Sequence, residues 1–216
     1  MRSISLSGVM GAGKTTLAEH FEFRYTLTRV AWGDAMKIEF FDAMRSGEMP
    51  SFIEKPDLLF PNIQSDQRKI SWVDRHKPEV RTALQKYATE YRRAQEPDYW
   101  VKRGLARIDE FLKQGRTIVV DDTRFPDEVR ALKSRGFIAA ILDVLPEQQA
   151  ERIMQRDSHF DPKSREHPSE HALDGWKFDS RIKNHTDLAR LELLGTVLIN
   201  TARFSIDRQA PAISLG

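Results

Sequence analysis

Apolar side chains follow two spacings in turn along the chain, one typical of strands and the other of helices. Short apolar or β-branched runs predict strands at 2–7, 29–32, 117–120, 137–144, 179–184 and 196–200. Apolar positions three and four apart predict helices at 14–25, 35–44, from 77 onward, from 97 to 114, 126–134, 146–157 and 187–194. Strands that alternate with helices in this way are typical of an α/β protein with a parallel sheet.

Two stretches do not follow this alternation. Residues 48–76 contain three prolines, and we expect an irregular insertion there whose apolar side chains pack over a site. The apolar side chains concerned are Phe52, Leu58, Leu59, Phe60 and Trp72. Residues 157–178 are rich in charge, proline and histidine, which predicts a loop or lid. A chain of 216 residues with 40% hydrophobic residues suits one domain, over 1–216, with insertions.

Composition limits the classes of function. The 34 basic and 32 acidic residues give a formal net charge of +2, so no strong one-signed field favours a dedicated nucleic-acid binder. Without cysteine the chain has no disulfide, thiolate metal site or cysteine nucleophile, which fits a reducing cytoplasm. No apolar run approaches the ~20 residues that span a bilayer. We therefore expect a soluble cytoplasmic protein without membrane partners.

The most specific motif follows the first predicted strand. Residues 8–16 read Gly-Val-Met-Gly-Ala-Gly-Lys-Thr-Thr and match the pattern G-x-x-x-x-G-K-[ST]. In this pattern a glycine-rich turn points backbone N–H groups at phosphates, and the lysine reaches the outer phosphates. The motif predicts that ATP is bound by Gly8, Gly11, Ala12, Gly13, Lys14, Thr15 and Thr16.

A magnesium site is expected beside this loop. In such loops the hydroxyl of the residue at Thr15 holds Mg²⁺. Asp122, and less strongly Asp121, ends the apolar strand at 117–120, where an acid can orient the metal and its waters. The alternative is that the two acids only cap a helix or stabilise a turn.

Several arginines are candidates for phosphate binding and catalysis together with Lys14. Arg124 lies two residues beyond Asp122, where its guanidinium can bind a phosphate with two hydrogen bonds. Arg152 and Arg156 share a helix face, and with Arg165 they place three cations near the expected lid, suited to the charge on a transferred phosphoryl group. The alternatives are a surface ion pair for Arg124 and a solvated basic face for the other three.

The chain also resembles the bacteriophage-type deoxynucleoside monophosphate kinases of the P-loop kinase fold. Short motifs carry the resemblance, in the family's order: Ile4-x-Leu6-Ser7-Gly8 leading into Gly13-Lys14, Leu84-Gln85 followed by Thr89-Glu90, Asp98-Tyr99-Trp100-Val101, Val119-Val120-x-Asp122-Thr123-Arg124, His167-Pro168-Ser169-Glu170, and Ile182-x-Asn184. The resemblance implies a three-layer P-loop kinase fold with a parallel central sheet between helices. It also implies Mg²⁺-dependent transfer of the ATP γ-phosphate to a deoxynucleoside 5′-monophosphate.

The same resemblance implies where the acceptor binds. It places an acceptor-binding helical insertion at about 34–96 and a lid at about 146–178, within one domain. The implied substrate-binding residues are Asp34, Lys37, Arg81, Gln85, Thr89, Glu90, Arg93, Arg124 and Glu170. A monophosphate acceptor is already an anionic nucleophile, so no general base is required. If the chain is phage-encoded, it would act in the host cytoplasm, in deoxynucleotide metabolism.

Two other functions stay open. One is a P-loop kinase that phosphorylates a hydroxymethylated pyrimidine in phage DNA, which the balanced charge disfavours. The other is an ATP-driven switch or binding module, which needs no second phosphate site. Free nucleotides are thus the expected partners, nucleic acid is less favoured, and a homodimer is left open.

Overall fold

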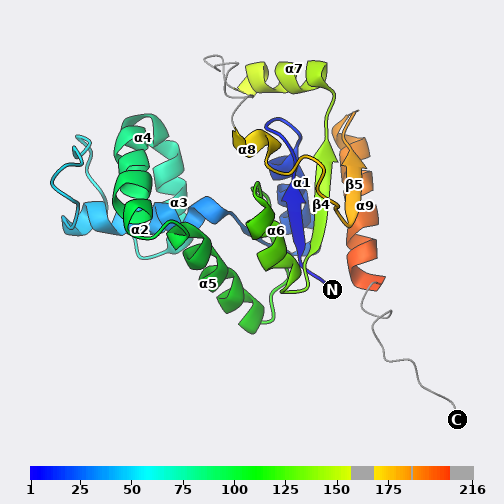
Figure 1. The fold of residues 1–216 in the computed structure, drawn as a ribbon, viewed down its shortest axis with the longest axis horizontal. Helices are drawn as coiled ribbons and strands as arrows, with labels where there is room; N and C mark the ends of the chain where they lie inside the picture. The colour runs from blue at the N-terminus through cyan, green and yellow to red at the C-terminus, as the bar shows by residue number, and fades with distance from the viewer. Residues whose placement is uncertain (157–167, 186, 205–216) are drawn as a thin grey trace, which may run out of the picture. The chain divides into compact units, whose positions relative to one another are not determined.

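The structure, a computed structural model, describes residues 1–156, 168–185 and 187–204 (Figure 1). Its elements fall into two units, each described by itself below. The first unit comprises Met1–Ala31 and the described residues from Phe111 onward, and the second comprises Trp32–Glu110. The insertion that the sequence predicts at about 34–96 falls within the second unit. None of the helices in the described ranges is long and apolar enough to cross a membrane.

A parallel sheet of five strands forms the centre of the first unit. Its strands are β1 (Ile4–Ser7), β2 (Thr28–Val30), β3 (Ile118–Val120), β4 (Ile138–Asp143) and β5 (Ser180–Lys183). They lie in the order β2-β3-β1-β4-β5, and every neighbouring pair is parallel. Since parallel strands end at the same edge, the loops after β1 and β3 emerge side by side. This register brings the glycine-rich loop close to the acids that follow β3.

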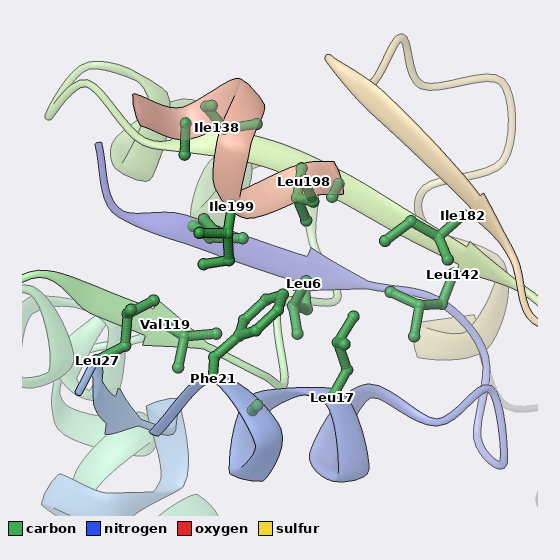
Figure 2. Packing of buried hydrophobic residues seen from close by; sticks show 14 of the residues in the cluster. Leu6, Leu17, Phe21, Leu27, Val119, Ile138, Leu142, Ile182, Leu198 and Ile199 are labelled. Atoms are coloured by element: carbon green, nitrogen blue, oxygen red, sulfur yellow. The ribbon is translucent and has the colours of Figure 1, made fainter. Parts of the chain in front are cut away.

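Helices flank the sheet of the first unit. They are α1 (Lys14–Tyr25), α6 (Pro126–Lys133), α7 (Pro146–Arg156), α8 (Pro168–His171) and α9 (Leu188–Phe204). Leu17 and Phe21 of α1 and Leu198 and Ile199 of α9 share one apolar cluster with Leu6 of β1 (Figure 2). Helix α6 packs on β4, and its buried residues lie outside that cluster. The sheet therefore has helices on both faces, as the sequence predicts.

The second unit consists of helices around its own core. They are α2 (Trp32–Ser46), α3 (Asp66–Arg75), α4 (Lys77–Lys86), the π-helix η1 (Tyr87–Arg93) and α5 (Tyr99–Lys113), whose last residues count with the first unit. Fully or nearly fully buried aromatic side chains fill the core, among them Phe40, Phe41, Tyr87 and Trp100. The π-helix continues α4 directly, and such segments are frequent at functional sites.

The predicted last strand at 196–200 is wrong, because these residues belong to helix α9. Their apolar, β-branched composition favours a strand, but Leu191, Leu198 and Ile199 are buried with α1 at helical spacing. A Cβ at Gly195 would lie 2.5 Å from Cδ1 of Leu17, so only glycine lets the two helices approach this closely. Packing thus overrides the local preference for a strand.

Two predictions in the second unit also need correction. The strand predicted at 29–32 ends at Val30, and the helix predicted at 35–44 already begins at Trp32. The stretch 48–76 is not irregular throughout, because α3 occupies Asp66–Arg75 and buries Ile70 and Val73. Nor do all its apolar side chains pack inward, since Leu59 is 89% exposed.

Candidate active site

The glycine-rich loop joins β1 to α1 in a conformation that requires glycine. Gly8, Gly11 and Gly13 have φ angles of 133°, 78° and 94°. A Cβ at Gly8 would lie 2.5 Å from the Leu142 carbonyl oxygen, and one at Gly13 would lie 2.6 Å from Nδ2 of Asn184. Helix α1 begins at Lys14, and the N–H groups of a first helical turn have no acceptor within the helix. The loop therefore presents several N–H donors to an anion.

Lys14 is buried at the start of α1, and its ammonium faces neutral oxygens. Its Nζ donates to the carbonyl oxygens of Gly8, at 2.5 Å, and Val9, at 3.0 Å. Burial, together with the nearby charge of Arg124, lowers the pKa of Lys14 to about 8, although Glu170 and two aspartates oppose the shift. A phosphate bound here would supply the negative charge that this ammonium needs.

Asp121, directly after β3, contacts Thr15 at the end of the glycine-rich loop. Its side chain is 3% exposed, and its Oδ2 accepts hydrogen bonds from Oγ1 of Thr15, at 3.2 Å, and Nε of Arg29, at 3.0 Å. Its Oδ1 is buried with no hydrogen-bond partner among the described residues. A hydroxyl and a carboxylate with an unused buried oxygen fit the preference of Mg²⁺ for oxygen ligands. The sequence ranked Asp122 first; it is half-buried one position further on, and its metal-binding role stays a prediction.

Arg124 lies at the same edge, in the loop between β3 and α6. The buried Glu128 of α6 fixes this loop, because its Oε2 accepts from the backbone N–H groups of Arg124, at 2.8 Å, and Phe125, at 3.1 Å. Burial raises the pKa of Glu128, and these two hydrogen bonds oppose the shift. The Arg124 side chain is 34% exposed and pairs through Nη1 with Oε1 of Glu170. The charge of Arg124 is thus held near that of Lys14.

Glu170, in α8, reaches the glycine-rich loop itself. Its side chain is 3% exposed, and its Oε2 accepts the Met10 N–H at 2.6 Å. Both carboxylate oxygens are therefore engaged, one by the loop and one by Arg124. The predicted contact of Glu170 with the substrate stays a prediction; in the structure its carboxylate lies between Met10 of the glycine-rich loop and Arg124.

Three side chains that hold the site together are not among the candidate site residues predicted from the sequence, although Asn184 belongs to one of the motifs that carry the family resemblance. Nε2 of Gln149, in α7, donates to the Met10 carbonyl oxygen at 2.8 Å, and Nδ2 of Asn184 donates to that of Ala12 at 2.9 Å. Arg29 holds Asp121. Asn184 directly follows β5, and a buried polar residue at this edge of a sheet was an available signal. Nothing in the sequence distinguishes Gln149 from the other polar residues of its helix.

The proposed lid arginines are only partly described. Nη2 of Arg152 lies 3.4 Å from the carbonyl oxygen of Asn184, so this guanidinium is near the loop after β5. Arg156 is the last residue of α7. Arg165 and the rest of 157–167 lie outside the described residues. The lid role of these arginines stays a prediction.

Five of the seven predicted acceptor residues of the second unit are exposed, and the other two, Asp34 and Lys37, are half-buried. Arg81 and Gln85 are exposed on α4, and Thr89, Glu90 and Arg93 are exposed on η1. The Thr89 hydroxyl donates to the Gln85 carbonyl oxygen at 2.7 Å. In α2, Nζ of Lys37 lies 2.8 Å from Oδ2 of Asp74, and Asp34 lies in the first turn.

A half-buried cluster around the Arg92–Glu39 ion pair fixes the π-helix that carries three of these residues. Nε of Arg92 lies 2.6 Å from Oε1 of Glu39, and its guanidinium lies over the rings of Tyr87, Tyr91 and Tyr99. The Tyr87 and Tyr99 hydroxyls donate to the two oxygens of Glu39, at 2.9 and 2.7 Å. Burial and Glu39 raise the pKa of both tyrosines. No motif or periodicity in the sequence indicates this cluster, which anchors η1 to α2.

Neither a protein-family model nor a curated protein matches the chain. Several solved structures do. An unliganded sugar kinase from Janibacter sp. HTCC2649 has a TM-score of 0.54 at 17% identity, covering 93% of this chain and 95% of its own. A gluconokinase from Sinorhizobium meliloti 1021 has a TM-score of 0.51 at 18% identity, and the match covers 97% of this chain and 98% of the gluconokinase. A dephospho-CoA kinase from Campylobacter jejuni has a TM-score of 0.51 at 16% identity, and the match covers 93% of this chain and 97% of the dephospho-CoA kinase. These likenesses confirm the predicted P-loop kinase fold.

Proposed function

We propose that this protein is a kinase that transfers the γ-phosphoryl group of ATP to a deoxynucleoside 5′-monophosphate. One observation carries the proposal: the glycine-rich loop, Lys14, the Thr15–Asp121 pair and Arg124 converge at one edge of the sheet. An anion-binding loop, a magnesium pair and a separate arginine are the parts that phosphoryl transfer needs, since it is catalysed by positioning and charge compensation. The kinase fold of the similar structures supports this reading.

In this reaction an oxygen of the acceptor phosphate attacks the γ-phosphorus and forms the new P–O bond. The bond between the γ-phosphorus and the β–γ bridging oxygen breaks, and ADP leaves with that oxygen. The acceptor leaves as a diphosphate. An ionised phosphate acceptor has no proton to lose, so alignment replaces general-base catalysis.

The residues around the glycine-rich loop have separate roles in this step. The N–H groups at the start of α1 hold the β-phosphate, and Lys14 leaves its carbonyl partners to neutralise the β- and γ-phosphates. Mg²⁺, held by Thr15 with Asp121, supplies positive charge to the same phosphates when bound. Arg124 binds an equatorial oxygen of the transferred group or the acceptor phosphate.

The choice of a monophosphate acceptor is supported by the family resemblance and by the exposed residues of the second unit. Gln85 and Glu90 offer hydrogen-bonding groups for a base, and Arg93 offers a charge for its phosphate. Sugar and gluconate kinases share the fold, so the fold alone does not select the acceptor.

A coupled assay of ADP release tests the function. The acceptors are dAMP, dGMP, dCMP, dTMP, 5-hydroxymethyl-dUMP and an oligonucleotide that contains 5-hydroxymethyl-deoxyuridine. We expect ADP release to depend on at least one monophosphate. Transfer to the oligonucleotide alone would favour the DNA kinase, and ADP release independent of every acceptor would contradict both kinase functions.

A further inference from the structure

Both backbone hydrogen-bonding groups of Met10, in the glycine-rich loop, are bound by buried side chains. Glu170 of α8 accepts its N–H at 2.6 Å, and Gln149 of α7 donates to its carbonyl oxygen at 2.8 Å. The side chain of Glu170 is 3% exposed, and Gln149 is 7% exposed. Burying a charged carboxylate is unfavourable unless it is paired and hydrogen-bonded, so these contacts have to compensate for the lost hydration of Glu170.

The second oxygen of Glu170 pairs with Nη1 of Arg124. A guanidinium has five N–H donors in a fixed plane, so a bond at Nη1 sets the direction of the remaining donors without using them up. The backbone of Arg124 is fixed separately by Glu128. Arg124 is therefore held at both ends, its backbone by α6 and its guanidinium by a carboxylate that is itself attached to the phosphate loop.

A carboxylate beside a phosphate site needs a reason, because its negative charge weakens anion binding. The charge of Glu170 lies near Lys14 and Arg124, and both cations are expected to meet phosphate. A residue selected only for ATP affinity would be neutral or basic here. The position of Glu170 is better explained by what it does to Arg124.

We propose that Glu170 is a positioning residue that ties the Arg124 guanidinium to the phosphate loop, so that Arg124 meets the phosphoryl group in transfer. This inference rests on the proposed function. It gives Glu170 a role through Arg124 in place of the direct substrate contact that the sequence predicts.

Glu170→Gln separates positioning from affinity. The glutamine oxygen can still accept from Met10 N–H, but its NH₂ group then faces the donors of Arg124. Because a misplacement of about 1 Å can cost about 10²-fold, we expect kcat to fall by about 10²-fold. The KM for ATP stays within about threefold or decreases, because one negative charge is lost. Glu170→Asp keeps the charge and should restore part of kcat.

The matched control is Glu151→Gln, an exposed position of α7 whose carboxylate contacts only Gln155 among the bonds described. This substitution also removes one negative charge, and it should leave kcat and the KM for ATP unchanged. Thermal unfolding of each variant, followed by circular dichroism, establishes that the folded population is the same at the assay temperature. The assay uses Mg·ATP and the best acceptor of the monophosphate panel.

A double-mutant cycle decides whether Glu170 acts through Arg124. In the Arg124→Ala background, Glu170→Gln should change kcat by less than about threefold, since the group it positions is gone. Additive losses, or a raised ATP KM with unchanged kcat, would overturn the inference while the wild-type transfer still upholds the proposed function. Absence of transfer by the wild-type protein with every acceptor would overturn both.

Discussion

Two charged residues beside the glycine-rich loop, Lys14 and Asp121, are both buried, although their proposed roles require them to carry charge. Lys14 has to remain charged to meet phosphate, yet the fold buries it against carbonyl groups and lowers its pKa to about 8. Asp121 is almost fully buried with one oxygen unpartnered among the described residues. Such groups reduce the stability of the protein without ligand and are stabilised when a ligand binds. Stability and function therefore change in opposite directions at these positions.

For Lys14 the conflict predicts a pH-dependent stability. Its pKa in the folded protein, about 8, lies below the ordinary value of 10.5, so the unfolded chain binds more protons between these values. The free energy of unfolding without nucleotide therefore gains a contribution from Lys14 as the pH rises from about 8 to 10.5. Lys14→Met should remove this contribution, raise the stability at pH 7 by about 1–3 kcal/mol and abolish transfer.

Urea unfolding of both proteins at pH 7 and pH 10 measures this difference. Between the two pH values the stability gap between variant and wild type should shrink. A gap that does not depend on pH would mean that the charge of Lys14 is not the cause.

The two adjacent acids can be separated by substitution. Asp121→Asn should raise the Mg²⁺ concentration for half-maximal activity by about tenfold or more, because the proposed metal ligand is also the hydrogen-bond partner of Thr15. Asp122→Asn is the matched comparison, with the same chemistry one residue away. A larger effect at Asp122 would assign the metal-binding role to Asp122, the residue that the sequence ranks first.

The sequence alone could not decide between these acids. Successive side chains of a strand point to opposite sides, so one of two adjacent residues faces the loop. Both Val119 and Val120 are fully buried. Their burial therefore does not indicate which of the two acids after them points toward the loop. The motif at 8–16 was predictable because its glycines and lysine act locally. Gln149 and Glu170 act on that loop from about 140 and 160 residues away in sequence, where no periodicity connects them.

Among the helices and strands, the βα units near the loop were predictable from the sequence. Of α9, only the first half was predicted as a helix. The range 14–25 coincides with α1, since its apolar spacing and its start after Gly13 are local signals. The second half of α9 was misassigned because its fold depends on Leu17 and Phe21 of α1, far away in the sequence. Helix α3 was missed because the prolines before it suggested a loop throughout.

Close packing of α9 on α1 predicts an unequal response of two helical glycines. Gly195→Ala should lower the free energy of unfolding by about 1–3 kcal/mol, because the new methyl group would overlap with Leu17 and Phe21. Gly33→Ala, in α2, meets no atom within 4 Å and should be neutral or stabilise by about 0.5–1 kcal/mol. Chemical denaturation of the wild type and both variants measures these changes in the free energy of unfolding. Equal effects would contradict the packing assigned to Gly195.

For the molecule as a whole, each unit has its own core and its own set of candidate functional residues. The residues that contact the phosphate loop in the bonds described above belong to the first unit. The predicted acceptor residues from Asp34 to Arg93 belong to the second. Substitutions of these second-unit residues should therefore weaken acceptor binding and leave ATP binding largely unchanged.

Arg93→Ala tests this separation and distinguishes a kinase from an ATP-driven switch. The variant should lower kcat/KM for the monophosphate by about 10²-fold or more, because a charge-assisted contact to phosphate is lost, while ATP affinity stays within about twofold. Arg68→Ala, at an exposed position of α3, is the control. Titration calorimetry gives the ATP affinity, and the coupled assay gives kcat/KM. Unchanged transfer would remove Arg93 from the acceptor site.

The central claim is that a second phosphate accepts the γ-phosphoryl group. Phosphorus-31 NMR of a mixture of protein, Mg·ATP and each deoxynucleoside monophosphate tests it most directly. We predict that the β-phosphate signal of a deoxynucleoside diphosphate grows in equal amount with ADP. Growth of ADP and inorganic phosphate alone, with every monophosphate unchanged, would contradict the claim.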